Sequence, residues 1–151
     1  MVEFHGFGKI PRWSRDVVIT EKIDGTNAQI YIPELTTQAL AFPLLVGSRT
    51  RWITPDDDNH GFARWAYEHV EELLRLGPGH HFGEFWGQGI QRGYGLDHKR
   101  FSLFNTAKWS DDTVRPACCH VVPVVLAGPL TDAAISLAME SLWHHGSVAA
   151  P

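Results

Sequence analysis

The alternation of apolar and polar positions predicts a chain of strands with two helices inserted between them. Residues 17–32, "VVITEKIDGTNAQIYI", place two β-rich runs on either side of an Asp-Gly pair, the strongest short signal for a β-hairpin. Apolar side chains recur at helical spacing over residues 59–76, and again from the N-cap Thr131 to Trp143. Further strands are expected within residues 39–50, 80–86, 100–106 and 119–128. This order predicts an α+β domain with a mostly antiparallel sheet.

Composition and charge restrict the class of protein. The 151 residues suit one domain, and 44% hydrophobic with 20% charged residues is typical of a globular protein. The net charge of −4 argues against non-specific coating of nucleic acid, although it leaves room for a local basic groove. No apolar run approaches the ~20 residues of a membrane span, and the N-terminus lacks a signal-peptide core. We therefore expect a cytoplasmic protein with no membrane partner.

The cysteines and the paired histidines lack the spacing of a metal site. Cys118 and Cys119 are adjacent, which gives neither a disulfide framework nor a Cys-x-x-Cys zinc motif. They are interpreted as two buried, small apolar residues. Two adjacent histidine pairs are poorly placed to share one metal ion and are interpreted as surface residues: His80-His81 and His144-His145.

Lys22 stands just before the Asp-Gly pair, and it is either a solvated residue or a nucleophile. A free lysine has a pKa of about 10.4, so only about one in a few thousand is neutral at pH 7. A nucleophilic lysine therefore needs desolvation or a nearby cation to lower its pKa. From spacing alone, the simpler interpretation is a solvated lysine at a hairpin.

Two arginines follow an apolar run in "GSRTRW", residues 47–52. If the run continues as a strand, Arg49 and Arg51 share a face, because side chains at i and i+2 point the same way. Two guanidinium groups on one face suit a phosphate or ribose site. The alternative is a solvated strand end.

One carboxylate, Glu84, lies among aromatic residues in "HHFGEFWGQGIQRGYG", residues 80–95. Burying a carboxylate is costly unless it is paired or binds a ligand. Glu84 is therefore a candidate functional residue. The glycines that follow form neither a P-loop nor a dinucleotide-binding turn, and tight turns are the simpler explanation for them.

These segments together resemble a known superfamily. "EKIDGTN" is similar to the Lys-x-Asp-Gly motif of ATP-dependent DNA and RNA ligases and mRNA capping enzymes, closest to the RNA ligase 2-like branch. "GSR" at residues 47–49, "FGEFWGQGIQRGYG" and "KRFSLFN" resemble the next three motifs in the same order. The resemblance covers roughly residues 3–105. It implies an ATP-grasp-like nucleotidyltransferase (adenylation) domain.

The resemblance implies a covalent mechanism. Lys22 would attack the α-phosphate of ATP, form lysyl-AMP and release pyrophosphate. Asp24 and Glu84 would hold waters of a magnesium ion, which neutralises the phosphate and lowers the pKa of the lysine. Arg49 and Glu84 would hold the ribose.

The adenine side of the site follows from the same resemblance. Glu21 would face the adenine, and Phe104 would stack on it, with Phe101 as the competing choice for the stack. Asn27 would lie close to the α-phosphate. The partner would be nucleic acid with 5′-phosphate and 3′-hydroxyl ends, RNA rather than DNA, which the enzyme would seal.

The sequence departs from the family pattern after Phe104. Beyond the second helix the family has a Glu-Gly pair and a Lys-x-Lys strand, whereas here the later lysine and glutamate are Lys108 and Glu140. We therefore expect residues 1–151 to be one domain, the N-terminal portion of an RNA ligase adenylyltransferase domain whose C-terminal part is missing. Such an edge would expose an apolar patch on the strand at 119–128 and on the Trp143 side of the last helix, and would favour self-association.

Three functional hypotheses remain at this point. The first is an ATP-dependent RNA ligase. The second is a truncated, catalytically impaired remnant that binds nucleotide or RNA. The third is a non-enzymatic interaction domain whose aromatic residues only form a core.

Overall fold

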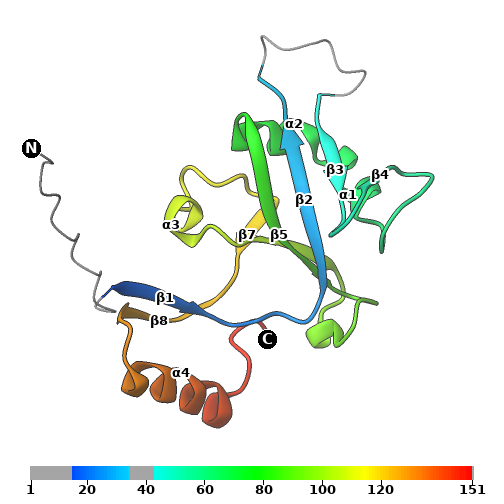
Figure 1. Cartoon of the computed structure of the whole chain (residues 1–151). Coiled ribbons are helices and arrows are strands. Elements are labelled where there is room, and N and C mark those ends of the chain that lie inside the picture. Colours follow the sequence, from blue (N-terminus) through cyan, green and yellow to red (C-terminus); the bar gives the residue numbers. More distant parts are fainter. Residues whose placement is uncertain (1–14, 35–42, 151) are drawn as a thin grey trace, which may run out of the picture.

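The computed structural model describes residues 15–34 and 43–150, which form two sheets and four α-helices (Figure 1). The strands are β1 (Asp16–Thr20), β2 (Thr26–Ile32), β3 (Leu45–Gly47), β4 (Trp52–Ile53), β5 (Gly79–Gly87), β6 (Lys99–Leu103), β7 (Cys119–Val121) and β8 (Val124–Pro129). The helices are α1 (Phe62–Glu68), α2 (Val70–Leu73), α3 (Thr106–Trp109) and α4 (Asp132–His145), with 3-10 turns η1 (Leu74–Leu76) and η2 (Gly93–Gly95).

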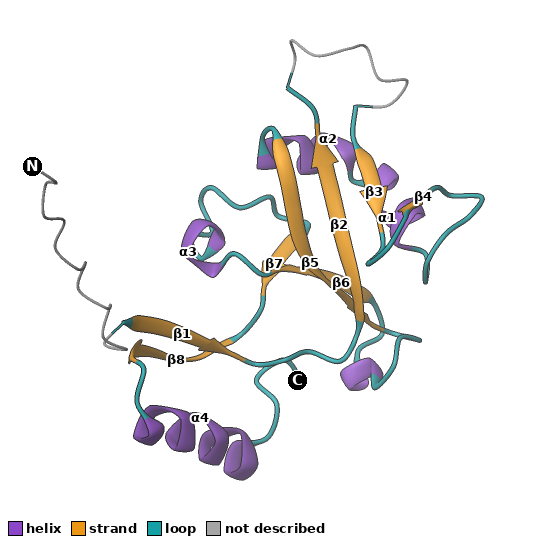
Figure 2. Cartoon of the chain, in the orientation of Figure 1, coloured by secondary structure: helices purple, strands orange, loops and turns teal. Residues whose placement is uncertain are grey.

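The larger sheet has the strand order β4-β3-β2-β5-β6-β7. Every neighbouring pair in it is antiparallel except β6 and β7. The smaller sheet pairs β1 with β8 in antiparallel register, and Figure 2 shows it at the opposite end of the molecule from β3 and α2. The prediction of an α+β domain with mostly antiparallel sheets is confirmed.

One face of the larger sheet is covered by α1 and α2. Along β2, Ala28, Ile30 and Ile32 are buried in the core with Phe62 of α1. The Phe62 ring centroid lies 4.9 Å from that of Phe85. The intervening residues of β2, Asn27, Gln29 and Tyr31, point to the opposite face of the sheet, which α1 and α2 do not cover.

The helix predicted over residues 59–76 is interrupted at His69. His69 has φ −111° and ψ 20°, outside the helical region, so α1 ends there and α2 begins. Its ring Nδ1 lies 2.7 Å from the carbonyl oxygen of Trp65, the same oxygen that accepts from the His69 amide. A side chain that competes for a backbone acceptor weakens a helix locally.

The hairpin predicted over residues 17–32 is wrong. β1 pairs with β8, whereas β2 pairs with β3 and β5, so the two runs belong to different sheets. Residues 21–25 cross between the sheets: the Glu21 amide donates to the Pro123 carbonyl at one end. At the other end, a Cβ on Gly25 would lie 2.6 Å from the carbonyl oxygen of Phe85. Gly25 is therefore required by the close approach of β5 and not by a hairpin turn.

The histidine pairs differ in environment. His144 and His145 are exposed at the end of α4, as expected. His81, in contrast, is buried, and its Nε2 lies 2.8 Å from the carbonyl oxygen of Gly77, so its interpretation as a surface residue is wrong. Burial is the main cause that lowers the pKa of His81. Strand alternation separates it from the exposed His80.

The helix α4 is capped as predicted but is only lightly packed. The Thr131 hydroxyl accepts from the Ala134 amide, and Gly146 ends the helix with φ 78°. Ala138 is its buried residue, whereas Trp143 is 83% exposed and Met139 is 65% exposed. Exposed apolar side chains therefore lie on the last helix, as expected for its Trp143 side, and the wider patch with the strand at 119–128 stays a prediction. Among the helices in residues 15–34 and 43–150, none has the length and apolar character needed to cross a membrane.

We predict that Gly83→Ala destabilises the protein. A Cβ at this position would overlap the Ser102 carbonyl oxygen of the neighbouring strand and would lie 2.7 Å from the Phe101 ring. Overpacking of this kind lowers the free energy of unfolding by about 1–3 kcal/mol. Gly47→Ala is the control, because its Cβ would meet the Gln29 side chain, which can rotate away. Equal urea midpoints for the two variants would contradict this explanation.

Candidate active site

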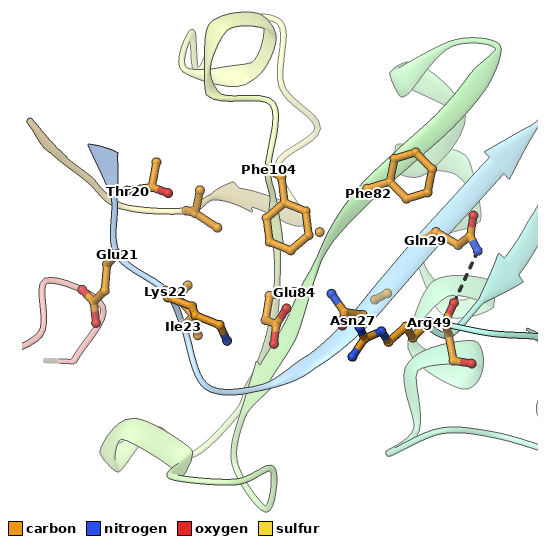
Figure 3. Close-up of a pocket in the computed structure, with 14 residues that line it drawn as sticks. Thr20, Glu21, Lys22, Ile23, Asn27, Gln29, Arg49, Phe82, Glu84 and Phe104 are labelled. Atoms are coloured by element: carbon orange, nitrogen blue, oxygen red, sulfur yellow. Dashed lines mark hydrogen bonds between the residues drawn. The ribbon is translucent and has the colours of Figure 1, made fainter. Parts of the chain in front are cut away.

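A cavity of about 560 Å³ opens on the uncovered face of the larger sheet. It lies between β2, β5 and the segment that follows β1 (Figure 3). Its walls are Thr20, Glu21, Lys22, Ile23, Asn27, Ala28, Gln29, Ser48, Arg49, Phe82, Gly83, Glu84, Phe104 and Val122. The structure thus brings together six of the seven residues singled out from the sequence: Glu21, Lys22, Asn27, Arg49, Glu84 and Phe104. The chemical role of each stays a prediction.

The position of Lys22 follows from the crossing between the sheets. β1 ends at Thr20, and the next residues run along the cavity before β2 begins at Thr26. Figure 3 shows the Lys22 side chain directed toward Glu84. The charge of Lys22 also acts on Glu84, since it lowers the pKa of that carboxyl group. Lys22 is exposed, as spacing alone indicated, but it lies in the crossing between the two sheets and not at a hairpin.

The carboxylate of Glu84 is buried in the cavity wall. It lies on β5 directly opposite Asn27 of β2, is 8% exposed, and accepts a hydrogen bond of 3.1 Å from the Gly25 amide. Burial raises its pKa above the usual value for glutamate, and the charge of Asp24 adds to this rise. The Gly25 amide and the Lys22 charge oppose the rise without cancelling it. A carboxylate whose charged form is destabilised by burial, and which lies beside a lysine, is typical of a functional site.

The two arginines predicted to share a face have different surroundings. Residues 49–51 form bends between β3 and β4, so the strand does not continue and Arg49 and Arg51 do not share a strand face. Arg49 lines the cavity. Arg51 instead forms an ion pair with Asp57, in which both of its terminal nitrogens bind the carboxylate. Of these two guanidinium groups, that of Arg49 is thus the one available to a ligand in the cavity.

The two phenylalanines differ in burial. Phe101 is fully buried in the core, 5.1 Å from the Phe62 ring, and cannot reach a ligand. Phe104 comes directly after β6, is 44% exposed and lines the cavity. Its amide donates to the carbonyl of Phe82, a second exposed aromatic residue in the same wall.

The carboxylate of Glu21 is held by the C-terminal segment. It accepts from the Ser147 hydroxyl and from the amides of Val148 and Ala149, at 2.8 and 3.2 Å for the two amides. The side chain is 8% exposed and is directed toward that segment, away from Lys22 (Figure 3). A carboxylate can accept about four hydrogen bonds, so one acceptor position is left for a ligand.

The seventh predicted residue, Asp24, does not line the cavity. Its carboxylate pairs with Arg92, with Oδ2 and Nε 3.4 Å apart, and its amide donates to the Tyr94 hydroxyl at 2.7 Å. Within the described residues, no group of three His, Cys, Asp or Glu side chains could hold a metal ion.

Among the cavity residues that were not singled out from the sequence are Gln29 and Phe82. Gln29 lies two positions after Asn27 on β2 and points to the same face, and its Nε2 donates to the Ser48 carbonyl at 3.3 Å. Strand alternation was the signal for Gln29. Phe82 lies opposite it on β5 and was read only as an aromatic neighbour of Glu84.

Comparison with protein families identifies the chain. A family model described as RNA ligase matches residues 15–147. The chain belongs to the RNA ligase family. No curated protein matches the sequence. The predicted resemblance to RNA ligases of the nucleotidyltransferase type is confirmed.

Solved structures of another RNA ligase share this fold. A mutant of Naegleria gruberi RNA ligase with AMP and Mn matches with a TM-score of 0.57 at 17% identity. A second mutant of that ligase, with ATP and Mn, matches with a TM-score of 0.55 at 18% identity. Each match covers 85% of this RNA ligase family chain and 40% of the solved chain. The chain thus spans about 40% of the length of these ligases, and the likeness establishes the fold.

Proposed function

We propose that this chain carries the adenylyltransferase chemistry of an ATP-dependent RNA ligase. The observation that carries the proposal is the shared cavity of Lys22 and Glu84, with Arg49 and Phe104 in the same walls. The neutral Lys22 amine attacks the α-phosphorus of ATP. A nitrogen–phosphorus bond forms, the bond to the bridging oxygen breaks, and pyrophosphate leaves with that electron pair while the amine loses a proton. The lysyl-AMP then passes its AMP to an RNA 5′-phosphate, and a 3′-hydroxyl displaces AMP to seal the strand.

The walls of the cavity fit a nucleotide. Phe104 presents an exposed ring for stacking on the adenine, and the remaining acceptor position of Glu21 suits the amino group of the base. Arg49 and Glu84 hold the ribose, and Asn27 lies nearest the α-phosphate. This part of the proposal agrees with the AMP and ATP carried by the Naegleria gruberi RNA ligase structures.

The residues also fit a magnesium ion that arrives with the triphosphate. Magnesium is usually held by one or two carboxylates, several waters and substrate phosphates. Glu84 is the cavity carboxylate beside Lys22, and Asp24 stands close enough to affect its pKa. The Asp24–Arg92 pair is exposed, so turning Asp24 toward the ion costs little free energy. When bound, the ion would neutralise phosphate charge.

We predict that the protein labels itself with ATP carrying a radioactive α-phosphate, in the presence of magnesium. The label should stay on the protein through denaturing electrophoresis at neutral or alkaline pH, because a covalent adduct is what distinguishes catalysis from binding. ATP labelled at the γ-phosphate is the matched control and should leave no label, since pyrophosphate departs.

Two other outcomes of this experiment would decide against the proposal. Retention of both labels on a filter, with no label left on the denatured protein, would identify a nucleotide-binding remnant. Binding of neither label would favour an interaction domain, for which the exposed apolar side chains of α4 provide a surface. Self-association through that surface stays a prediction.

A further inference from the structure

Four aromatic side chains continue the uncovered face of the larger sheet beyond the cavity. They come from three strands and are called the aromatic strip: Trp52, Tyr31, His80 and Phe82. Tyr31 lies directly opposite His80 across β2 and β5, with ring centroids 4.5 Å apart. The next cross-strand pair toward the cavity is Gln29 and Phe82, followed by Asn27 and Glu84. The strip therefore begins one pair away from the candidate catalytic carboxylate.

The rings of the strip lie near one another, and part of their surface remains exposed to solvent. His80 and Phe82 are stacked, with an interplanar angle of 6° and centroids 5.8 Å apart. Trp52 and His80 are stacked at 23° and 6.4 Å. Despite these contacts, Phe82 is 54% exposed and Trp52 is 47% exposed. Exposed apolar side chains that adjoin one another mark a binding surface more often than chance exposure does.

A smaller cavity joins the strip on its other side. Its volume is about 230 Å³, and Phe82 and Phe104 form the wall that it shares with the larger cavity. Lys108 lines it, with Nζ held 4.4 Å from the centroid of the Trp109 ring. Among the described residues that line it, none is acidic. This surface therefore suits a ligand that combines flat rings with negative charge.

We infer that the aromatic strip stacks unpaired bases of an RNA strand, while Lys108 contacts its phosphates. The inference rests on the proposed function, because it takes the end of that strand to lie in the larger cavity. Stacking on aromatic side chains accepts any base, and is worth about 1–3 kcal/mol per base. The bases of a duplex are already paired and stacked on one another. The strip thus selects single-stranded nucleotides next to the junction.

The test is the binding of a short fluorescein-labelled single-stranded RNA, followed by anisotropy at low salt and without ATP. Trp52→Leu keeps an apolar side chain at the sheet edge but removes the flat ring. It should weaken binding about 5- to 150-fold, the equivalent of one stacked base. Trp52→Phe should restore most of the affinity. Trp143→Leu is the matched control, because Trp143 is an exposed tryptophan on α4, and it should bind as the unmodified protein does.

An RNA of the same length with abasic positions separates stacking from charge. It keeps every phosphate, so it should bind weakly and should not distinguish Trp52→Leu from the unmodified protein. Equal loss of affinity for normal and abasic RNA would overturn the inference. Unchanged affinity of Trp52→Leu for normal RNA would also overturn it. A dimer in sedimentation that only Trp52→Leu disrupts would overturn it as well, because it would assign the strip to a protein interface.

Adduct formation by the unmodified protein, measured in parallel, keeps the two proposals apart. Base-dependent binding without an adduct would support the strip and contradict the ligase chemistry. An adduct without base-dependent binding would support the chemistry and contradict the strip.

Discussion

Replacing Lys22 by alanine or by arginine is expected to abolish labelling of the protein by ATP. Alanine removes the nucleophile. Arginine keeps the positive charge next to Glu84 but does not lose a proton in proteins, so it cannot attack phosphorus. Both variants should therefore fall to the background of a covalent labelling assay scored on the denatured protein, although both should remain folded.

The matched control for this experiment is Lys99→Arg. Lys99 lies on β6, outside the cavity, where its Nζ donates to the His60 carbonyl oxygen. An arginine there keeps the charge, and labelling should continue at the rate of the unmodified protein. Persistent labelling of Lys22→Arg would show that another residue carries the nucleotide.

Replacing Glu84 by glutamine is expected to slow adduct formation and to stabilise the free protein. Glutamine is nearly the same size, and its carbonyl oxygen can still accept from the Gly25 amide. It lacks the charge that would hold the metal ion and orient the ribose. Loss of one preorganised electrostatic contact costs roughly 10²–10³-fold in rate, so labelling should fall by that factor, while Glu140→Gln on the exposed surface of α4 leaves it unchanged.

The stability effect of Glu84→Gln has a defined pH dependence. Burial raises the pKa of Glu84 in the folded protein, so between the unfolded and folded pKa values the folded state binds more protons than the unfolded state. The contribution of Glu84 to stability therefore falls as pH rises through that window. Glutamine does not titrate, so the gain in thermal midpoint should be absent well below the unfolded pKa and constant above the folded one. A variant less stable than the original at neutral pH would contradict this account.

The order of the sequence motifs was enough to predict six of the residues that line the cavity. Lys22, Arg49, Glu84 and Phe104 are distant in sequence, and no local pattern could place them together. A resemblance over several ordered motifs did so, because it carries tertiary information that periodicity lacks. Local periodicity by itself left Lys22 as an exposed residue of a hairpin.

The errors come from interactions between distant segments. An Asp-Gly pair between two β-rich runs is a sound signal for a hairpin, but β8 pairs with β1 and β5 occupies the edge of β2 that β1 would need. The segment that binds Glu21 lies more than a hundred positions away, at Ser147 to Ala149, and nothing near Glu21 indicates it. Similarly, the aromatic strip depends on the register of three strands, which sequence spacing does not fix.

The most direct test of the account is to locate the covalent nucleotide by peptide mapping. The unmodified protein is incubated with ATP and magnesium, digested without reducing the pH to strongly acidic values, and its peptides are sequenced by tandem mass spectrometry. The account predicts one AMP on the Lys22 side chain, next to Glu21 and Asp24, and unmodified Lys99 and Lys108. AMP on either of those lysines, or nucleotide binding with no modified peptide, would contradict the assignment of this cavity as the site of adenylylation.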